Sequence, residues 1–275
     1  MTPGSAAPQA GDLDLLVAAV AKTRKYSSLC PDLVRRLGSQ ELRKRQGLAQ
    51  AVKATKNKLH QVAGAFLDSG MRYPRWLEQL EAAARTGGPA GQRAVCLKVL
   101  GLQSSTRERL EIMDEFYAAI FSRLPPVRSV LDLACGLNPL AIPWMPVEAG
   151  CAYYAYDVYL DMMDFIGRFL ALAGIKGRAE CRDILGLAAF PKTDLTLVLK
   201  SLPCLDQIEK DASLALLDKI ESPFLVVSYP VHSLGRRDRD MPRNYRERFQ
   251  GLVRGRGWQV AEIGFRSELV FLINR

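Results

Sequence analysis

The feature that most constrains the fold is a change of pattern at Val127, after which short apolar segments alternate with helical ones. Apolar residues at helical spacing fill the gaps, for example over residues 160–173 and 212–220. This alternation is typical of a parallel sheet with helices on both faces. The predicted strands are residues 129–133, 151–156, 178–181, 195–199 and 224–228.

The C-terminal end of the chain has a different pattern. Residues 258–265 and 268–273 fit two further strands, and only Arg266 and Ser267 lie between them. So short a connection requires an antiparallel hairpin. We therefore predict an α/β fold of the Rossmann-like, seven-stranded class I methyltransferase type, in contrast to the all-parallel sheet of dehydrogenases.

The N-terminal part, up to about Gly101, shows helical spacing and few strand-like alternations. Apolar residues recur at i, i+3, i+4 and i+7 from Leu13 and again from Cys30. Residues 86–91, rich in glycine, predict a loop. Ser105 and Glu108 fit a capping box that opens a helix reaching Leu124. We expect an all-helical domain over residues 1–104 and a second domain over residues 105–275.

The net charge of +9 is concentrated in two segments. Residues 22–58 hold eleven Lys and Arg but only two acidic residues, and residues 236–256 hold eight Arg and three acidic residues. Clustered positive charge suits a polyanion, because each neutralised phosphate releases condensed counterions. We interpret both segments as a nucleic-acid-binding surface; the alternative is a basic face that only contacts solvent.

Other classes of protein are disfavoured. No apolar run approaches the roughly 20 residues of a membrane-spanning helix, and residues 1–14 lack the basic start of a secretory signal. Six Cys occur without a C-x-x-C pair, beside only two His, so zinc-ligand spacing is absent. We expect a soluble, cytoplasmic protein with reduced thiols and no metal.

Three acidic residues, Asp132, Asp157 and Asp183, lie near the carboxyl ends of three successive predicted strands. The first strand runs into D-x-A-x-G-x-N, where small residues such as Gly136 let the backbone approach a ligand. Asp157 ends the second strand, where a carboxylate can accept both hydroxyls of a ribose. Asp183, with Ile184 beside it, suits the adenine amino group. The pattern favours S-adenosylmethionine over a nicotinamide cofactor, whose phosphate glycines are missing.

The segment after the fourth strand, residues 200–205, limits the chemistry. It lacks the Asn/Asp-Pro-Pro-Phe/Tyr element of enzymes that methylate exocyclic amines. A ring nitrogen such as guanine N7 has a lone pair and no proton to lose, so in-line methyl transfer needs no general base. Cys204 as a nucleophile is a weaker alternative.

Specific short motifs are spread over nearly the whole chain. They are Cys30 to Arg36 (C-P-D-L-V-R-R), Lys58-Leu59-His60 with Gly64-Ala65-Phe66, Ser105 to Leu110 (S-T-R-E-R-L), Asp132 to Leu140 (D-L-A-C-G-L-N-P-L), Lys200 to Leu205, Ser233-Leu234-Gly235, Asn244-Tyr245 and Glu268-Leu269. In this combination the chain resembles the aminoglycoside-resistance 16S rRNA methyltransferases, which modify guanine-1405 at N7.

The resemblance implies a set of site residues. Arg109 would pair with the methionyl carboxylate, and Lys200, the implied catalytic residue, would sit at the mouth near the target guanine. The RNA contacts, in the assembled 30S subunit, would come from Lys53, Lys56, Lys58, Arg236, Arg237 and Arg239, and we expect a monomer. The implied S-adenosylmethionine pocket consists of Phe66, Gln103, Ser104, Ser105, Arg109, Gly136, Asp157, Asp183, Ile184 and Leu199.

The chain departs from the family pattern at two positions. Ile208 stands where the family often has glutamine, with Gln207 next to it, and Asp240 replaces a glycine before Met241.

Two other functions remain as alternatives. A methyltransferase of small molecules is disfavoured by the basic residues 22–58. A non-enzymatic RNA-binding assembly factor is disfavoured by the presence of Arg109, Asp157 and Asp183.

Overall fold

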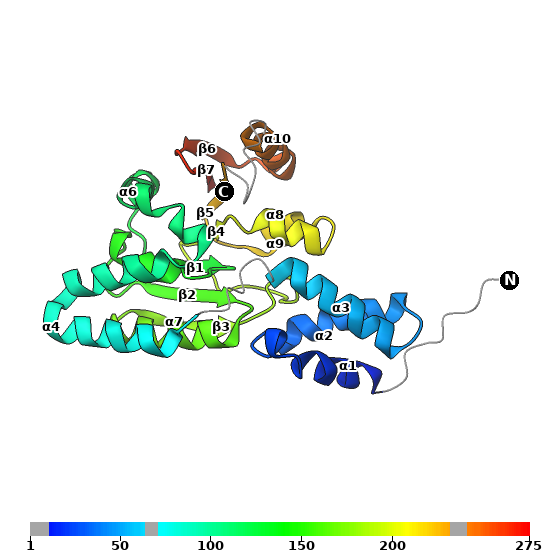
Figure 1. Ribbon diagram of the computed structural model, residues 1–275. Coiled ribbons are helices and arrows are strands. Elements are labelled where there is room, and N and C mark those ends of the chain that lie inside the picture. The colour runs from blue at the N-terminus through cyan, green and yellow to red at the C-terminus, as the bar shows by residue number, and fades with distance from the viewer. Residues whose placement is uncertain (1–10, 64–70, 232–240) are drawn as a thin grey trace.

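A seven-stranded sheet lies at the centre of the computed structural model, which describes residues 11–63, 71–231 and 241–275 (Figure 1). The strand order is β3-β2-β1-β4-β5-β7-β6; neighbours from β3 to β5 are parallel, and β7 is antiparallel to β5 and β6. The fold prediction is confirmed. The strands are β1 (Ser129–Leu133), β2 (Ala152–Asp157), β3 (Lys176–Cys181), β4 (Leu195–Leu199), β5 (Phe224–Pro230), β6 (Gln259–Gly264) and β7 (Glu268–Asn274).

The strand order places a ligand crevice at β1. This strand pairs with β2 on one side and β4 on the other. The sheet therefore grows outward from β1 in one direction through β2 and β3 and in the other through β4 and β5. Ligands of open α/β sheets bind beyond the carboxyl ends of the strands at such a switch point. The carboxyl ends of β1, β2 and β4 therefore mark the expected site.

Two apolar cores lie on opposite faces of the sheet. Along β1, Val130 belongs to one core, while Leu131 and Leu133 belong to the other, as side-chain alternation in a strand requires. The first core includes α6 (Met113–Phe121) and α7 (Leu160–Leu172). The second includes α8 (Leu202–Ile208), α9 (Ala212–Lys219) and α10 (Met241–Val253).

Three N-terminal helices pack together beside the β3 edge of the sheet, in the blue part of Figure 1. They are α1 (Asp12–Ala21), α2 (Pro31–Lys44) and α3 (Leu48–Ala63). In α2, Pro31 and Asp32 occupy the first turn and two basic residues the last, which suits the helix dipole. The apolar face of α2 is buried at Leu33 and Leu37.

The fourth helix, α4 (Tyr73–Leu100), packs against α7 and the 3-10 helix η3 (Asn138–Trp144) (Figure 1). Tyr73 stacks on Phe165 with ring centroids 5.3 Å apart. The break predicted at residues 86–91 is present as a sharp turn at Gly88, with φ 56° and ψ −151°, where two helices meet; the label α4 covers both of them (Figure 1).

The predicted capping box is wrong. Ser105 lies inside the short helix α5 (Ser104–Arg107), which has no side-chain cap, and the single predicted helix is divided into α5, η2 (Leu110–Ile112) and α6. Glu108 instead accepts a hydrogen bond from Lys200 at 2.8 Å. The long-range ion pair replaces the local cap because the Lys200 ammonium is enclosed and needs an acceptor.

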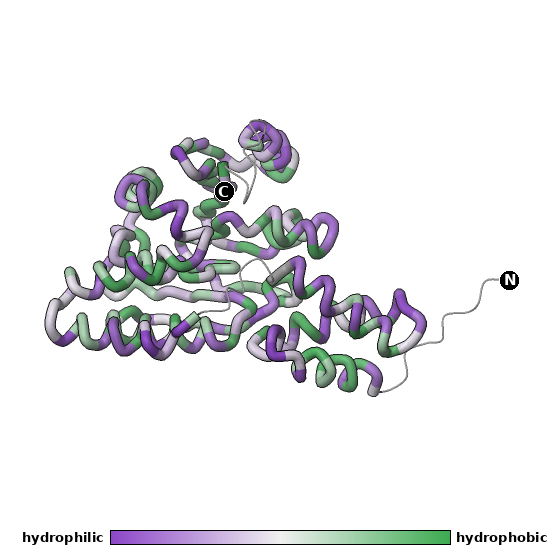
Figure 2. The backbone as a smooth tube through the Cα atoms, in the orientation of Figure 1, coloured by the Kyte–Doolittle hydropathy of each residue, from purple (hydrophilic) through white to green (hydrophobic). Residues whose placement is uncertain are grey.

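The helices differ in hydropathy. Figure 2 shows α10 mostly hydrophilic and α1 largely hydrophobic, and Leu15 of α1 is exposed. Within the described ranges, no helix is both long and apolar enough to cross a membrane.

Candidate active site

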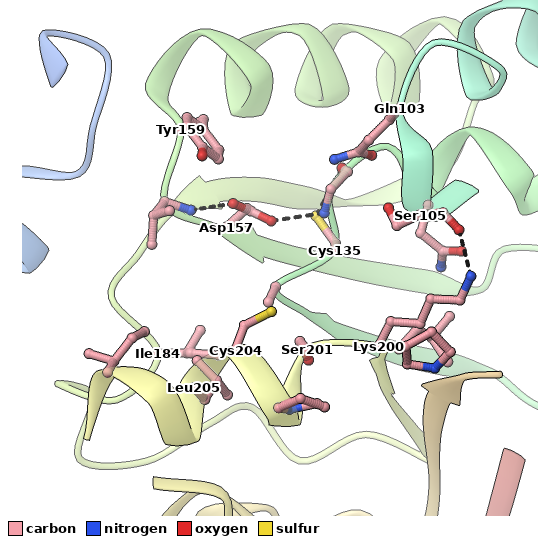
Figure 3. A pocket seen from close by; sticks show the side chains of 18 of the residues that line it. Gln103, Ser105, Cys135, Asp157, Tyr159, Ile184, Lys200, Ser201, Cys204 and Leu205 are labelled. Atoms are coloured by element: carbon pink, nitrogen blue, oxygen red, sulfur yellow. Dashed lines mark hydrogen bonds between the residues drawn. The ribbon is translucent and has the colours of Figure 1, made fainter. Parts of the chain in front are cut away.

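A cavity of about 360 Å³ opens at the carboxyl ends of β1, β2 and β4 (Figure 3). Small-molecule sites occupy roughly 300–1,000 Å³. Its walls come from the turn after β1, the ends of β2 and β4, the segment after β3, α5 and α2. Nine predicted cofactor residues line it: Gln103, Ser104, Ser105, Arg109, Gly136, Asp157, Asp183, Ile184 and Leu199. Phe66, the tenth, lies outside the described residues.

The turn after β1 forms the floor of the cavity. Ala134 and Gly136 have φ angles of 51° and 52°, a conformation that glycine adopts at little cost. A Cβ at Gly136 would lie 2.8 Å from the Gln103 side chain. Gln103 Oε1 accepts a hydrogen bond from the Leu137 amide at 2.9 Å. A side chain at position 136 would displace the Gln103 amide from this hydrogen bond.

Asp157 is fixed by the same turn. Its Oδ2 accepts the Gly136 N–H at 2.8 Å, and its Oδ1 accepts the Val158 N–H at 2.6 Å (Figure 3). Burial raises the pKa of Asp157, and the two backbone hydrogen bonds oppose that rise. Each carboxylate oxygen has two lone pairs, so acceptor capacity remains for a diol.

Asp183 and Ile184 form the opposite part of the cavity wall, and both are buried. The structure adds a partner that the sequence did not predict: Arg36 of α2 donates from Nε to Asp183 Oδ2 at 2.5 Å and from Nη2 to Oδ1 at 3.2 Å. Arg36 also lines the cavity.

Arg109 and Lys200 meet the buried carboxylate of Glu268. Arg109 contacts Glu268 Oε2 and Oε1 at 3.0 and 2.6 Å, and Lys200 Nζ lies 3.4 Å from Oε2. Burial raises the pKa of Glu268, but Arg109 and Lys200 outweigh burial, so its pKa is lowered. Glu268 was not predicted as a site residue, although a lone carboxylate opening the apolar run from Leu269 was a usable signal.

Lys200 lies deeper than the expected mouth position. Its side chain is only 7% exposed, and its Nζ donates to the Ser105 carbonyl at 3.0 Å and to Glu108 Oε2 at 2.8 Å. Its φ is 57°, which is uncommon for a residue other than glycine. Lys200 is therefore a fixed, fully paired cation in the cavity wall.

A second group of residues extends the cavity beyond the predicted cofactor set. It consists of Ser201, Pro203, Cys204, Pro230, Met241 and Tyr245. Tyr245 stacks on Tyr229 with centroids 4.7 Å apart. Ser201 Oγ is buried without a hydrogen-bond partner. Burial raises the pKa of the Cys204 thiol, which works against a thiolate nucleophile.

The predicted RNA-binding lysines differ in their surroundings. Lys53 is exposed and Lys56 half-buried. Lys58, which the resemblance implies as an RNA contact, pairs with the buried Glu41 at 2.8 Å. Arg236, Arg237 and Arg239 lie outside the described residues.

The residues present fit S-adenosylmethionine. A floor without a Cβ at Gly136, a buried carboxylate with spare acceptor capacity at Asp157 and an unpartnered hydroxyl at Ser201 provide close backbone approach and polar partners. Both Gln207 and Ile208 line the cavity, so the departure at Ile208 leaves an amide in the wall.

Comparison with known proteins agrees with this geometry. Residues 22–272 match the family described as ribosomal RNA methyltransferase (FmrO). A 16S rRNA (guanine(1405)-N(7))-methyltransferase of Frankia casuarinae is 37% identical, covering 99% of this chain and 98% of that protein. The enzyme of the same name from Micromonospora rosea is 36% identical, covering 96% and 97%. The solved structure of the 16S rRNA methyltransferase RmtF in complex with S-adenosyl-L-homocysteine superimposes with a TM-score of 0.80 at 28% identity, covering 98% of this chain and 100% of that one.

Proposed function

Because this chain belongs to the ribosomal RNA methyltransferase (FmrO) family, we propose that it uses S-adenosylmethionine to methylate N7 of guanine-1405 in 16S rRNA. The observation that carries the proposal is the cavity at the β1 switch point, with Gly136 and Asp157 as its floor. It occurs in a chain that matches relatives with this activity over nearly their whole length.

Each wall of the cavity has a proposed part in holding the cofactor. Asp157 accepts the ribose hydroxyls, Asp183 accepts the adenine amino group, and Ile184 covers the base. Gln103 to Ser105, with Leu199, enclose the middle of the cavity. The side chain of Arg109 uses three donors on Glu268 and Asn138 and also interacts with the Tyr117 hydroxyl, and a remaining N–H is proposed to donate to the methionyl carboxylate.

The cofactor supplies a methyl group on an electron-poor sulfonium. Guanine N7 carries a lone pair and no proton, so the chain's own groups need only hold the base in line and exclude water. Lys200 fits this role as a fixed cation, because two hydrogen bonds, to the Ser105 carbonyl and to Glu108, and an ion pair with Glu268 hold it in place. Ser201, Cys204 and Tyr245 extend the cavity on the side where the base would enter.

The substrate is proposed to be the assembled 30S subunit, with the enzyme acting as a monomer in the cytoplasm. The exposed basic residues within 22–58 supply phosphate contacts, and Lys53 is the most exposed of the three lysines on α3. A methyl on N7 removes the acceptor that an aminoglycoside can use at this base edge. Resistance to such aminoglycosides follows.

Transfer of radiolabelled methyl groups from S-adenosylmethionine tests the substrate. Purified protein is mixed with unmodified 30S subunits, with protein-free 16S rRNA, or with neither. We expect label in RNA from the 30S reaction and little in protein-free RNA. Label in protein-free RNA alone would contradict the 30S requirement, and no label in any RNA would contradict the proposed substrate.

A further inference from the structure

The N-terminal helical region reaches the cofactor cavity through residues 28–36. The Cys30 N–H donates to the Val158 carbonyl at 2.8 Å, and the Leu160 N–H donates to the Ser28 carbonyl at 2.8 Å. These bonds hold the start of α2 against the chain that follows β2, immediately beyond Asp157. Leu33 and Arg36, one turn apart on α2, then line the cavity.

Arg36 is bound there by three directed hydrogen bonds. Two go to the oxygens of Asp183, and Nη1 donates to Glu209 Oε2 at 2.7 Å. The Arg36 side chain is 19% exposed and that of Asp183 5%. A planar guanidinium that grips both carboxylate oxygens fixes the rotation of the carboxylate as well as its charge.

This fixation has a consequence for ligand recognition. Asp183 sits in the cavity wall beside Ile184, and each of its oxygens retains one lone pair after the contact with Arg36. A carboxylate held in one orientation presents those lone pairs in a fixed direction. It accepts an N–H donor in that direction and repels a carbonyl oxygen placed there.

We propose that Arg36, a residue of the N-terminal helical region, is a positioning residue that sets the selectivity of the cofactor site for a 6-amino purine. The proposal rests on the proposed function, in which Asp183 receives the adenine amino group. Arg36 acts through Asp183 and has no part in methyl transfer. The same region that carries the basic residues 22–58 thereby contributes Leu33 and Arg36 to the wall of the cofactor site.

The test compares binding of S-adenosylhomocysteine with binding of S-inosylhomocysteine, in which a carbonyl replaces the 6-amino group. Calorimetry on the full chain would use wild type, Arg36→Ala, Arg36→Lys and Arg35→Ala. Arg35 is a matched control, since it neighbours Arg36 but pairs on the exposed side with Asp14. Thermal unfolding of each variant shows whether it is folded.

We expect wild type and Arg35→Ala to prefer S-adenosylhomocysteine strongly. In Arg36→Ala, affinity for it should fall about tenfold, as loss of charge-assisted hydrogen bonds implies, while affinity for the inosine compound changes much less. Arg36→Lys keeps the charge without the fork, so its selectivity should be intermediate. Should Arg36→Ala fail to fold, Arg36→Lys provides the test.

Wild-type selectivity in folded Arg36→Ala or Arg36→Lys would overturn the role of Arg36 and leave the proposed function intact. Equal weakening of both compounds would overturn it too, because a merely structural contact does not distinguish the bases. A wild-type protein that binds neither compound would overturn the cofactor assignment itself.

Discussion

At the scale of single residues, the site is made of enclosed charges that bind one another. Arg36 pairs with Asp183, Arg109 with Glu268, and Lys200 with Glu108 and Glu268. Breaking such a pair is costly because it leaves a buried charge without its partner. Substitutions here therefore affect stability as well as binding, and each test needs both measurements.

Asp157→Ala separates these two effects. It removes the acceptor for the Gly136 and Val158 amides, so the free energy of unfolding should fall by about 2 kcal/mol, which most domains tolerate. Affinity for S-adenosylhomocysteine should fall at least about tenfold. Asp164→Ala, a change at an exposed residue of α7 that pairs with the exposed Arg168, should leave the affinity unchanged and the stability nearly so. Unchanged binding by Asp157→Ala would show that the ribose contact is misplaced.

Asp132 predicts a pH effect. Burial raises its pKa from 3.8 to about 6, although Asn138 and Tyr153 donate to it. The folded protein therefore takes up a proton more readily than the unfolded chain, so the stability linked to Asp132 is fully present below pH 3.8 and lost as pH rises through about 6.

The comparison with Asp132→Asn isolates this effect, because asparagine does not titrate. From about pH 7.5 to about pH 5, wild type should gain about 1.4 kcal/mol of unfolding free energy relative to the variant. Chemical denaturation at both pH values measures it. Parallel changes in the two proteins would mean that the pKa of Asp132 is not raised.

At the scale of elements, the strands were predictable because apolar runs and turn spacing are local signals. The ranges predicted for β1 and β4 agree with the structure, and the others agree closely. The helix from Ser105 to Leu124 was not predictable, since Glu108 is bound by Lys200, distant in sequence. Local capping rules do not register such a partner.

The site was predictable only in part, because some of its contacts join residues that are far apart in the sequence. Gly136, Asp157 and Asp183 follow strands at recognisable spacing, and the structure brings them into one cavity. Arg36 belongs to the motif Cys30 to Arg36, but the sequence does not indicate its role, because it is one of many basic residues and its partner Asp183 lies far along the chain. Its contact depends on how α2 docks on the sheet.

The helix pair α2–α3 allows a matched comparison of two lysines. Lys58 and Arg45 both pair with Glu41, which is 1% exposed, so Lys58→Ala removes one of two partners and should reduce the free energy of unfolding by about 1–3 kcal/mol. Lys53 is exposed, so Lys53→Ala should stay within about 0.5 kcal/mol of wild type yet weaken binding to 30S subunits. Denaturation and filter binding give the two readouts. Stability loss in Lys53→Ala, or none in Lys58→Ala, would contradict this division.

At the scale of the whole molecule, the two parts of the N-terminal region, α1 to α3 and α4, pack differently against the rest of the protein. Helix α4 packs directly on α7 and η3, whereas α1 to α3 pack mainly with one another at the sheet edge, where α3 also contacts α8 (Figure 1). We propose that α1 to α3 form the RNA-binding unit within the expected domain of residues 1–104. Arg36 and Leu33 place that unit in the wall of the cofactor cavity.

The proposed activity is methylation of a single ring nitrogen in the small ribosomal subunit. The most direct measurement treats 30S subunits with the protein and S-adenosylmethionine, cleaves the extracted 16S rRNA chemically at N7-methylguanosine and maps the break by primer extension. We predict a new break at guanine-1405 with wild type and almost none with Asp157→Ala. A break at another nucleotide, or transferred methyl groups without any break, would contradict the claim.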